Sequence, residues 1–240
     1  MPRPPRPFVE RFAGAAVLWI AVHGFVRAAD LTTWDGRHSI DRIDVTVVYY
    51  VPADRRPLAD WRDRVRYLCD RIRRFHDREF EGLSRLSVAI HPEPFISSLS
   101  TAALRQGDAD AIFFRTLRET DARLAFGRRN GGGFPVLLVL SDVNWRPLDD
   151  FARQVPTPDG WRFEGSLAED GGHVPGAAAG GSRATYLADA GKGWGLVSAD
   201  GGRVPMRGRD CVVFHEGVGH AIGLPQPEPA DGSVMSLGQY

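Results

Sequence analysis

Two histidines and one glutamate near the C-terminus are the residues of this chain best suited to catalysis. They lie in the segment His-Glu-Gly-Val-Gly-His at residues 215–220. Neutral imidazoles are common zinc ligands, and a glutamate beside them can take a proton from a zinc-polarised water and pass it to a leaving group. This combination predicts a zinc-dependent hydrolase with His215 and His220 as Zn²⁺ ligands and Glu216 as general base.

The spacing of the two histidines constrains the backbone between them. They are five residues apart, whereas zinc ligands on a regular α-helix are usually four apart. At about 100° per residue, five steps place them roughly 140° apart around the helix, too far to share one ion. A one-residue π-bulge or local unwinding would return both to one side. Because Gly217 and Gly219 tolerate distorted backbone, we expect non-standard helical hydrogen bonding across residues 216–220, with ring nitrogens roughly 3–4.5 Å apart.

The residues that follow resemble a known zinc-binding pattern. The run His-Ala-Ile-Gly-Leu-Pro at 220–225 and the tripeptide Ser-Val-Met at 233–235 are similar to the metal-binding region of the metzincin metallopeptidases, in particular the matrixin-like members. The resemblance covers only the C-terminal end of the chain. It implies a zincin-like fold, a turn of the chain at Gly223, a turn containing Met235 beneath the metal, and a third zinc ligand at Gln226.

Two departures from that pattern leave alternatives open. One residue is inserted between the histidines, a spacing similar to that of the dipeptidyl peptidase III family. Gln226 stands where the metzincins have histidine or aspartate, and its carbonyl oxygen is a weaker zinc ligand than either. The alternatives for the third ligand are Glu228, Asp231, a remote histidine such as His173, or no third protein ligand. Tyr240 is a further candidate, for stabilising an oxyanion.

The N-terminal residues predict export. Arginines precede a short apolar stretch at 12–22, and small residues follow, with a cleavage site after Ala28. The stretch is too short to span a bilayer comfortably, although an uncleaved anchor is the alternative. We therefore expect residues 1–28 to be a signal peptide and residues 29–240 to be one secreted or periplasmic catalytic domain, with no membrane association after cleavage.

The composition limits the classes of partner. The 30 basic and 30 acidic side chains balance, which argues against a nucleic-acid-binding surface or a polybasic membrane patch. The expected partner is a peptide or protein substrate. Two cysteines, Cys69 and Cys211, allow one pairing. Export permits this disulfide, and two buried thiols are the equal alternative.

The sequence patterns outside the motif predict an α/β (α+β) fold for the elements that position the site. Hydrophobic patterns predict strands at 44–51, 86–90, 134–140, 184–187 and 195–197, and helices at 61–80, 108–124 and 209–222. Strand, helix and strand in that order predict a single α/β domain with a twisted mixed sheet, a long helix and an active-site helix. The resemblance of the C-terminal motif implies that this domain is zincin-like (metzincin-like).

Other candidate ligands show no metal-binding pattern. His38, His76 and His91 have no ligand spacing and are expected at the surface or in caps. The Asp-Gly clusters at 107–110, 169–172 and 199–202 lack EF-hand spacing, so we expect turns rather than Ca²⁺ sites.

The function that these residues predict is that of a secreted zinc metalloendopeptidase. The alternative is a catalytically impaired pseudoprotease of the same fold that binds a metal or a partner. A third hypothesis is a non-enzymatic envelope or surface module, in which the two histidines are structural.

Overall fold

The computed structural model describes residues 31–126, 132–141, 153–157, 160–164, 182–198, 213–227 and 233–237. The strands in these ranges are β1 (Arg42–Val51), β2 (Arg85–Ile90), β3 (Phe95–Ile96), β4 (Phe134–Ser141), β5 (Arg153–Thr157), β6 (Gly160–Glu164), β7 (Ser182–Leu187) and β8 (Lys192–Ser198). The helices are α1 (Trp61–Phe80), α2 (Thr101–Leu104), α3 (Ala109–Leu124), η1 (Ala188–Ala190), η2 (His215–Gly219) and α6 (Val234–Leu237).

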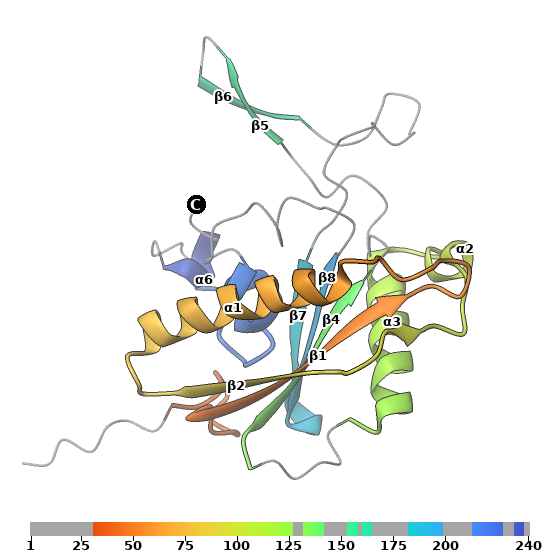
Figure 1. The fold of residues 1–240 in the computed structure, drawn as a ribbon. Helices are drawn as coiled ribbons and strands as arrows, with labels where there is room; N and C mark the ends of the chain where they lie inside the picture. Colours follow the sequence, from red (N-terminus) through yellow and green to blue (C-terminus); the bar gives the residue numbers. More distant parts are fainter. Residues whose placement is uncertain are drawn as a thin grey trace, which may run out of the picture.

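A six-stranded mixed sheet forms the centre of the molecule. Its strands lie in the order β2-β1-β4-β8-β7, and β3 extends the sheet by pairing with the end of β1. All neighbours are parallel except β7, which runs antiparallel to β8 at one edge. The sheet is visibly twisted in Figure 1. The prediction of an α/β domain with a twisted mixed sheet is therefore confirmed. Strands β5 and β6 form a separate antiparallel hairpin, which the sequence analysis did not predict.

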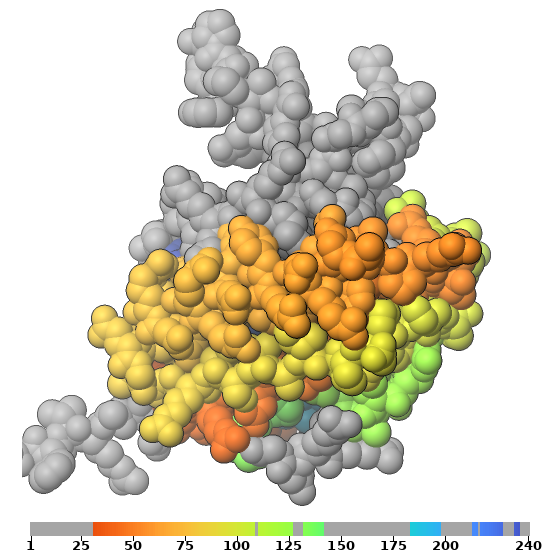
Figure 2. Space-filling view, viewed as in Figure 1, coloured from red at the N-terminus to blue at the C-terminus, as the bar shows by residue number. Residues whose placement is uncertain are grey.

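Helix α1 covers one face of this sheet and begins and ends where its periodicity predicts. The apolar residues at three- and four-residue spacing are buried: Trp61, Val65, Leu68, Cys69, Ile72 and Phe75. They pack against the alternate residues of β1 and β4 that point to the same side, such as Val45 and Leu138. The space-filling view shows α1 lying across this face (Figure 2). The same apolar core includes residues 213–222, hereafter the site helix.

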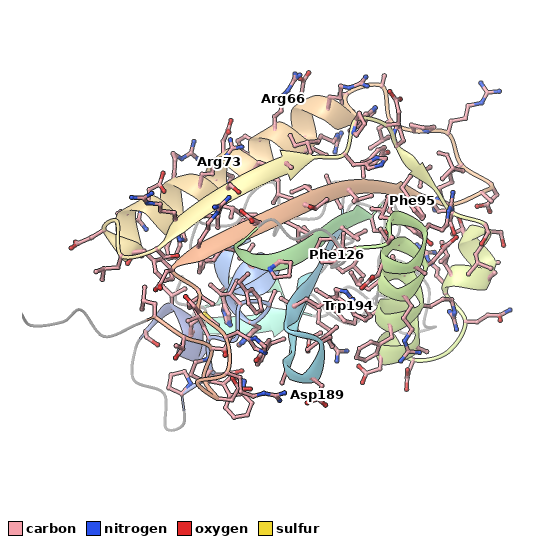
Figure 3. The ribbon with its side chains drawn as sticks, turned by 90° about the horizontal axis from the view of Figure 1, so that it is seen from below. Arg66, Arg73, Phe95, Phe126, Asp189 and Trp194 are labelled. Carbon is pink, nitrogen blue, oxygen red and sulfur yellow. The ribbon has the colours of Figure 1, made fainter. Side chains whose placement is uncertain are left out.

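Helix α3 covers the opposite face and packs on the other set of alternating strand residues, including Leu137 and Val139. Asp108 caps its N-terminus by accepting a hydrogen bond from Ala111 N at 2.8 Å, so the Asp-Gly cluster at 107–110 is a turn and cap, as predicted. The indole of Trp194 points from β8 toward α3 (Figure 3). Its Nε1 donates to Asp121, which also pairs with Lys192. These contacts fix β8, the strand on which the site helix rests.

The prediction that His76 lies at the surface is wrong, because this side chain is 0% exposed. The buried stripe of α1 is wider than its apolar stripe. Phe214 of the site helix covers the last turns of α1, with its ring centroid 5.0 Å from that of Phe75. The His76 ring stacks on Phe80, and its Nε2 has no hydrogen-bond partner in the structure. Burial lowers the pKa of His76, opposed by Asp77, so the ring is held neutral.

Several predictions fall on residues outside the described ranges. These include the signal peptide at 1–28 and the Asp-Gly clusters at 169–172 and 199–202. Cys211 also lies outside, whereas Cys69 is a free, buried cysteine whose pKa burial raises to about 12. Within the part of the chain that is described, no helix has the length and apolar character needed to cross a bilayer.

Candidate metal centre

The backbone between the two histidines is a π-helix. Residues 213 and 214 are α-helical, and residues His215–Gly219 form the π-turn η2. The predicted non-standard hydrogen bonding is therefore confirmed. Hydrogen bonds in a π-turn link residues five apart instead of four, so the residue at i+5 returns to the same side as residue i. The extra residue in the motif is accommodated by this wider turn.

The π-turn brings the two imidazoles into contact. The Nε2 atoms of His215 and His220 lie 2.8 Å apart, and the ring centroids are 4.7 Å apart. This distance is shorter than the 3–4.5 Å expected from the sequence, because the rings are hydrogen-bonded to one another. Two nitrogens bound tetrahedrally to one zinc at about 2.1 Å would be about 3.4 Å apart. To reach this separation from 2.8 Å, the two Nε2 atoms would have to move apart by about 0.6 Å.

The hydrogen-bond partners assign the protons on the two rings. His220 Nδ1 lies 3.2 Å from the carbonyl oxygen of Leu224, which can only accept, so Nδ1 carries the proton. The Nε2 of neutral His220 then holds a lone pair, and His215 Nε2–H donates to it. A carbonyl that holds the far nitrogen of a ligating imidazole is the usual arrangement behind metal-binding histidines. The Leu224 carbonyl thus holds the ring of His220 with its Nε2 lone pair directed at His215 Nε2.

Burial keeps both imidazoles neutral. His215 is 5% exposed, and burial, reinforced by the neighbouring His220, lowers its pKa to about 4. Burial also lowers the pKa of His220, opposed by the hydrogen bond to Leu224. At neutral pH both rings are therefore uncharged, as metal binding requires, and the proton on His215 Nε2 would have to move to Nδ1 before both Nε2 atoms could bind a cation.

Two glycines of β8 allow the site helix to lie directly on the sheet. A methyl group at Gly193 would overlap the carbonyl oxygen of Ala221, and one at Gly195 would overlap that of Gly217. Both glycines are on the face of β8 that points to the site helix, while Trp194 between them points to α3. Strand glycines often mark such a close backbone approach. The distance of the histidines from the sheet is set by these contacts.

The glycines inside the motif have a different role from the predicted one. Neither Gly217 nor Gly219 has a positive φ, so the π-turn does not need glycine for its backbone conformation. A Cβ at Gly219 would lie 2.7 Å from the sulfur of Met235, whereas at Gly217 the nearest atom would be 3.7 Å away. Gly219 therefore makes room for Met235 of α6, and the predicted proximity of this methionine to the site helix is found.

The site helix ends at Gly223, where the sequence predicts a turn. Gly223 has a φ of 73°. Leu224 N donates to Gly219 O and Gly223 N to His220 O, which is the Schellman pattern with glycine in the left-handed position. The carbonyl of Gly223 accepts a hydrogen bond from Trp34 N at 3.0 Å. The segment just before β1 is thereby joined to the end of the site helix.

A pocket of about 460 Å³ opens beside His220. Three parts of the chain line this His220 pocket: Trp34 before β1, Ala184, Thr185 and Tyr186 of β7, and Gly223, Leu224, Pro225 and Gln226 after the site helix. Gln226, the predicted third ligand, is exposed and lies at the rim of the pocket, on the same side as His220.

Among the described residues, the two predicted histidine ligands lie together, whereas no third ligand is identified. No group of three or more His, Cys, Asp or Glu side chains that could hold a metal is found among them. Glu216 lies in η2, but its side chain is outside the description, as are Glu228, Asp231, His173 and Tyr240. The roles of Glu216 and Gln226 remain predictions.

Zinc fits the part of the site that is described. The two neutral imidazoles face each other through their Nε2 atoms, and His220 borders a pocket from which a substrate could approach. Imidazole nitrogen is a preferred zinc donor. Comparisons with protein-family models, with curated proteins and with solved structures give no match to this chain. The functional argument therefore rests on the geometry of residues 213–227 and the sequence motif.

Several residues that shape the site were missed from the sequence. Gly193 and Gly195 carried a usable signal, because two glycines at strand spacing indicate close backbone approach on one face. Trp34 and Tyr186 carried none, since they join the His220 pocket from distant parts of the chain.

Proposed function

We propose that the chain is a zinc-dependent hydrolase that cleaves peptide bonds, with His215 and His220 as Zn²⁺ ligands. The observation that carries this proposal is the π-turn that sets their Nε2 atoms 2.8 Å apart. A five-residue spacing is compatible with a shared ion only if the helix is distorted in this way. The mixed sheet with a long helix and a separate site helix is compatible with the zincin-like fold that the C-terminal motif implies.

The chain's own residues divide the work as follows. His215 and His220 hold the metal, with the Leu224 carbonyl fixing the orientation of His220. When bound, zinc supplies Lewis acidity that lowers the pKa of a water to about 7. Glu216 takes the proton of the attacking water and delivers it to the amine that leaves. Gln226, which lines the pocket together with His220, is the proposed third ligand, and Met235 of α6 supports the site helix by packing beside Gly219.

The first experiment measures metal. Wild-type protein purified without chelator should contain close to one equivalent of zinc by atomic emission spectrometry. The His215→Ala/His220→Ala double variant should contain almost none. His91→Ala is the matched control, because His91 follows β2 at the far edge of the sheet, and it should keep the wild-type content. Equal zinc in wild type and double variant would overturn the assignment.

The second experiment measures catalysis. Zinc-loaded wild type should hydrolyse members of a mixed peptide library, read by mass spectrometry. Glu216→Gln should keep its zinc and lose nearly all hydrolysis, since an amide cannot accept the proton. If the variant cleaves as fast as wild type, another group is the base.

One observation favours the second candidate, a zinc-binding pseudoprotease of the same fold. The described residues contain no third His, Cys, Asp or Glu beside the histidine pair, and Gln226 is a neutral donor. Zinc binding without hydrolysis of any library member would favour this candidate. Absence of zinc binding would instead favour the non-enzymatic module, in which the 2.8 Å hydrogen bond between the histidines is a structural contact.

A further inference from the structure

Trp34 is the most exposed of the large hydrophobic side chains among the described residues, with 66% of its surface accessible. It also lines the pocket beside His220. An exposed indole at a concave site has apolar area that a ligand can cover, and tryptophan is enriched among residues that dominate binding. The position of Trp34 can therefore affect which substrate side chains the proposed peptidase binds.

The backbone that carries Trp34 is firmly held. Its N–H donates to Gly223 O at 3.0 Å, and Thr33 N donates to His38 O at 2.9 Å. Thr33 also packs against Gly223, and its hydroxyl donates to Asp35 at 2.6 Å. Little conformational entropy is therefore lost in this loop when a ligand stacks on Trp34, which favours tight and selective binding.

The opposite wall of the pocket is equally fixed. The hydroxyl of Tyr186 donates to Asp35 at 3.1 Å, and the Tyr186 ring packs edge-on against His38. This hydrogen bond connects β7 to the segment that carries Trp34. It also engages the carboxylate of Asp35, which already accepts from Thr33 and from Arg37 N. Asp35 does not line the pocket.

None of the described residues that line the pocket has a charged side chain. A positively charged ligand group would lose hydration there and gain no carboxylate partner among these residues, which is unfavourable. An aromatic ring could stack on the indole and contact Leu224 and Pro225. The volume of about 460 Å³ lies within the usual range for small-ligand sites and accommodates one large side chain.

We propose that Trp34 is a selectivity residue, and that the His220 pocket accepts an aromatic side chain of the peptide substrate. This inference rests on the proposed function, because His220 both lines the pocket and holds the metal. The residue of the substrate next to the scissile bond would then be phenylalanine, tyrosine or tryptophan, and arginine or lysine would be disfavoured at that position.

The experiment compares zinc-loaded wild type, Trp34→Ala and Trp34→Phe on peptides of one sequence. A single position beside the cleaved bond carries Phe, Ala, Asp or Arg. Trp34→Ala should lower kcat/KM for the Phe peptide at least tenfold and change that for the Ala peptide less than twofold. Trp34→Phe should keep most of the preference. Leu83→Ala, which truncates another exposed hydrophobic side chain (61% accessible), should behave as wild type.

A binding measurement separates this inference from the catalytic proposal. N-acetyl-phenylalaninamide is titrated into Glu216→Gln protein, and the indole N–H signal of Trp34, assigned through Trp34→Phe, is followed by NMR. A shift that N-acetyl-alaninamide does not produce supports the pocket, even if no peptide is cleaved. Hydrolysis by wild type with an unchanged Phe-to-Ala ratio in Trp34→Ala, or no shift of the Trp34 signal, overturns the inference while leaving the hydrolase proposal intact.

Discussion

Gly195→Ala tests whether direct contact between β8 and the site helix sets the position of the histidines. A Cβ at Gly195 would overlap the carbonyl oxygen of Gly217 and lie 2.9 Å from Leu138 Cδ1. The obstructing atom is backbone, so the site helix as a whole must move away, by about 1 Å for ordinary packing. Overpacking of this kind costs about 1–3 kcal/mol in the free energy of unfolding.

The same shift should affect the metal site. A displacement of about 1 Å in a catalytic group can lower activity by about 100-fold. We therefore expect Gly195→Ala to show a lower urea midpoint, a zinc content clearly below that of wild type, and an even larger loss of hydrolysis.

Gly217→Ala is the matched control on the other side of the contact. Its Cβ would meet Val197 Cγ2 at 3.7 Å, which is an ordinary distance, and its φ is not positive. Alanine is favoured over glycine in a helix by about 0.5–1 kcal/mol, so this variant should be as stable as wild type or slightly more stable. The reasoning is refuted if Gly195→Ala unfolds at the wild-type urea concentration, or if Gly217→Ala is the less stable variant.

Three further predictions concern the surroundings of the site. Burial lowers the pKa of His76, so the folded protein takes up a proton on this ring less readily than the unfolded chain does. The folded state therefore loses stability as the pH falls below the ordinary histidine pKa of 6.5, and this loss is absent above that pH. His76→Leu should therefore flatten the decrease in unfolding free energy between pH 7 and 5, by up to about 1.4 kcal/mol per pH unit. Gly223→Ala should destabilise by more than Gly82→Ala, since both have positive φ but only Gly223 is crowded by a neighbour. Asp121→Asn should cost about 1–3 kcal/mol in thermal unfolding, because it removes the negative charge that pairs with the largely buried ammonium of Lys192.

Each of these predictions has its own contradicting result. An unchanged pH slope in His76→Leu would mean that other groups cause the acid sensitivity. Equal losses in Gly223→Ala and Gly82→Ala would show that contact with Thr33 contributes nothing beyond backbone strain. Asp189→Asn removes the exposed ion pair with Arg37, so it should leave the thermal midpoint unchanged. If Asp189→Asn lowers the thermal midpoint as much as Asp121→Asn does, burial is not what makes the Asp121–Lys192 pair the more stabilising of the two.

Local pattern was sufficient for the elements that have strong periodicity. The range of α1 follows from apolar residues at helical spacing, and β1 and β4 follow from runs of β-branched residues. A distorted helix was also accessible, because the spacing of His215 and His220 excludes a shared ion on a regular helix; that the distortion is a π-turn and not local unwinding comes from the structure. In each case the decisive interactions are between residues close in sequence.

The features that the sequence did not predict depend on contacts between distant segments. His76 is buried because Phe214 lies over the end of α1, and no pattern within α1 reports this. Gly217 was taken for a flexible residue, although its importance lies in its carbonyl, which touches β8. The His220 pocket combines residues from before β1, from β7 and from after the site helix, so its lining could be found only from the fold.

Lys192 gives this fold an internal reporter of strand opening. It is the only lysine of the chain, so a protease that cuts after lysine meets a single peptide bond, the one before Gly193. That bond lies in β8, with β7 and β4 on its two sides at Gly193, and the Lys192 side chain is held by Asp121. Cleavage requires this part of the sheet to open, and its rate therefore measures the local opening free energy. The site helix rests on Gly193 and Gly195, so a cation bound by His215 and His220 would stabilise the closed sheet. Cleavage after Lys192 would then become slower as the fraction of protein with bound cation rises.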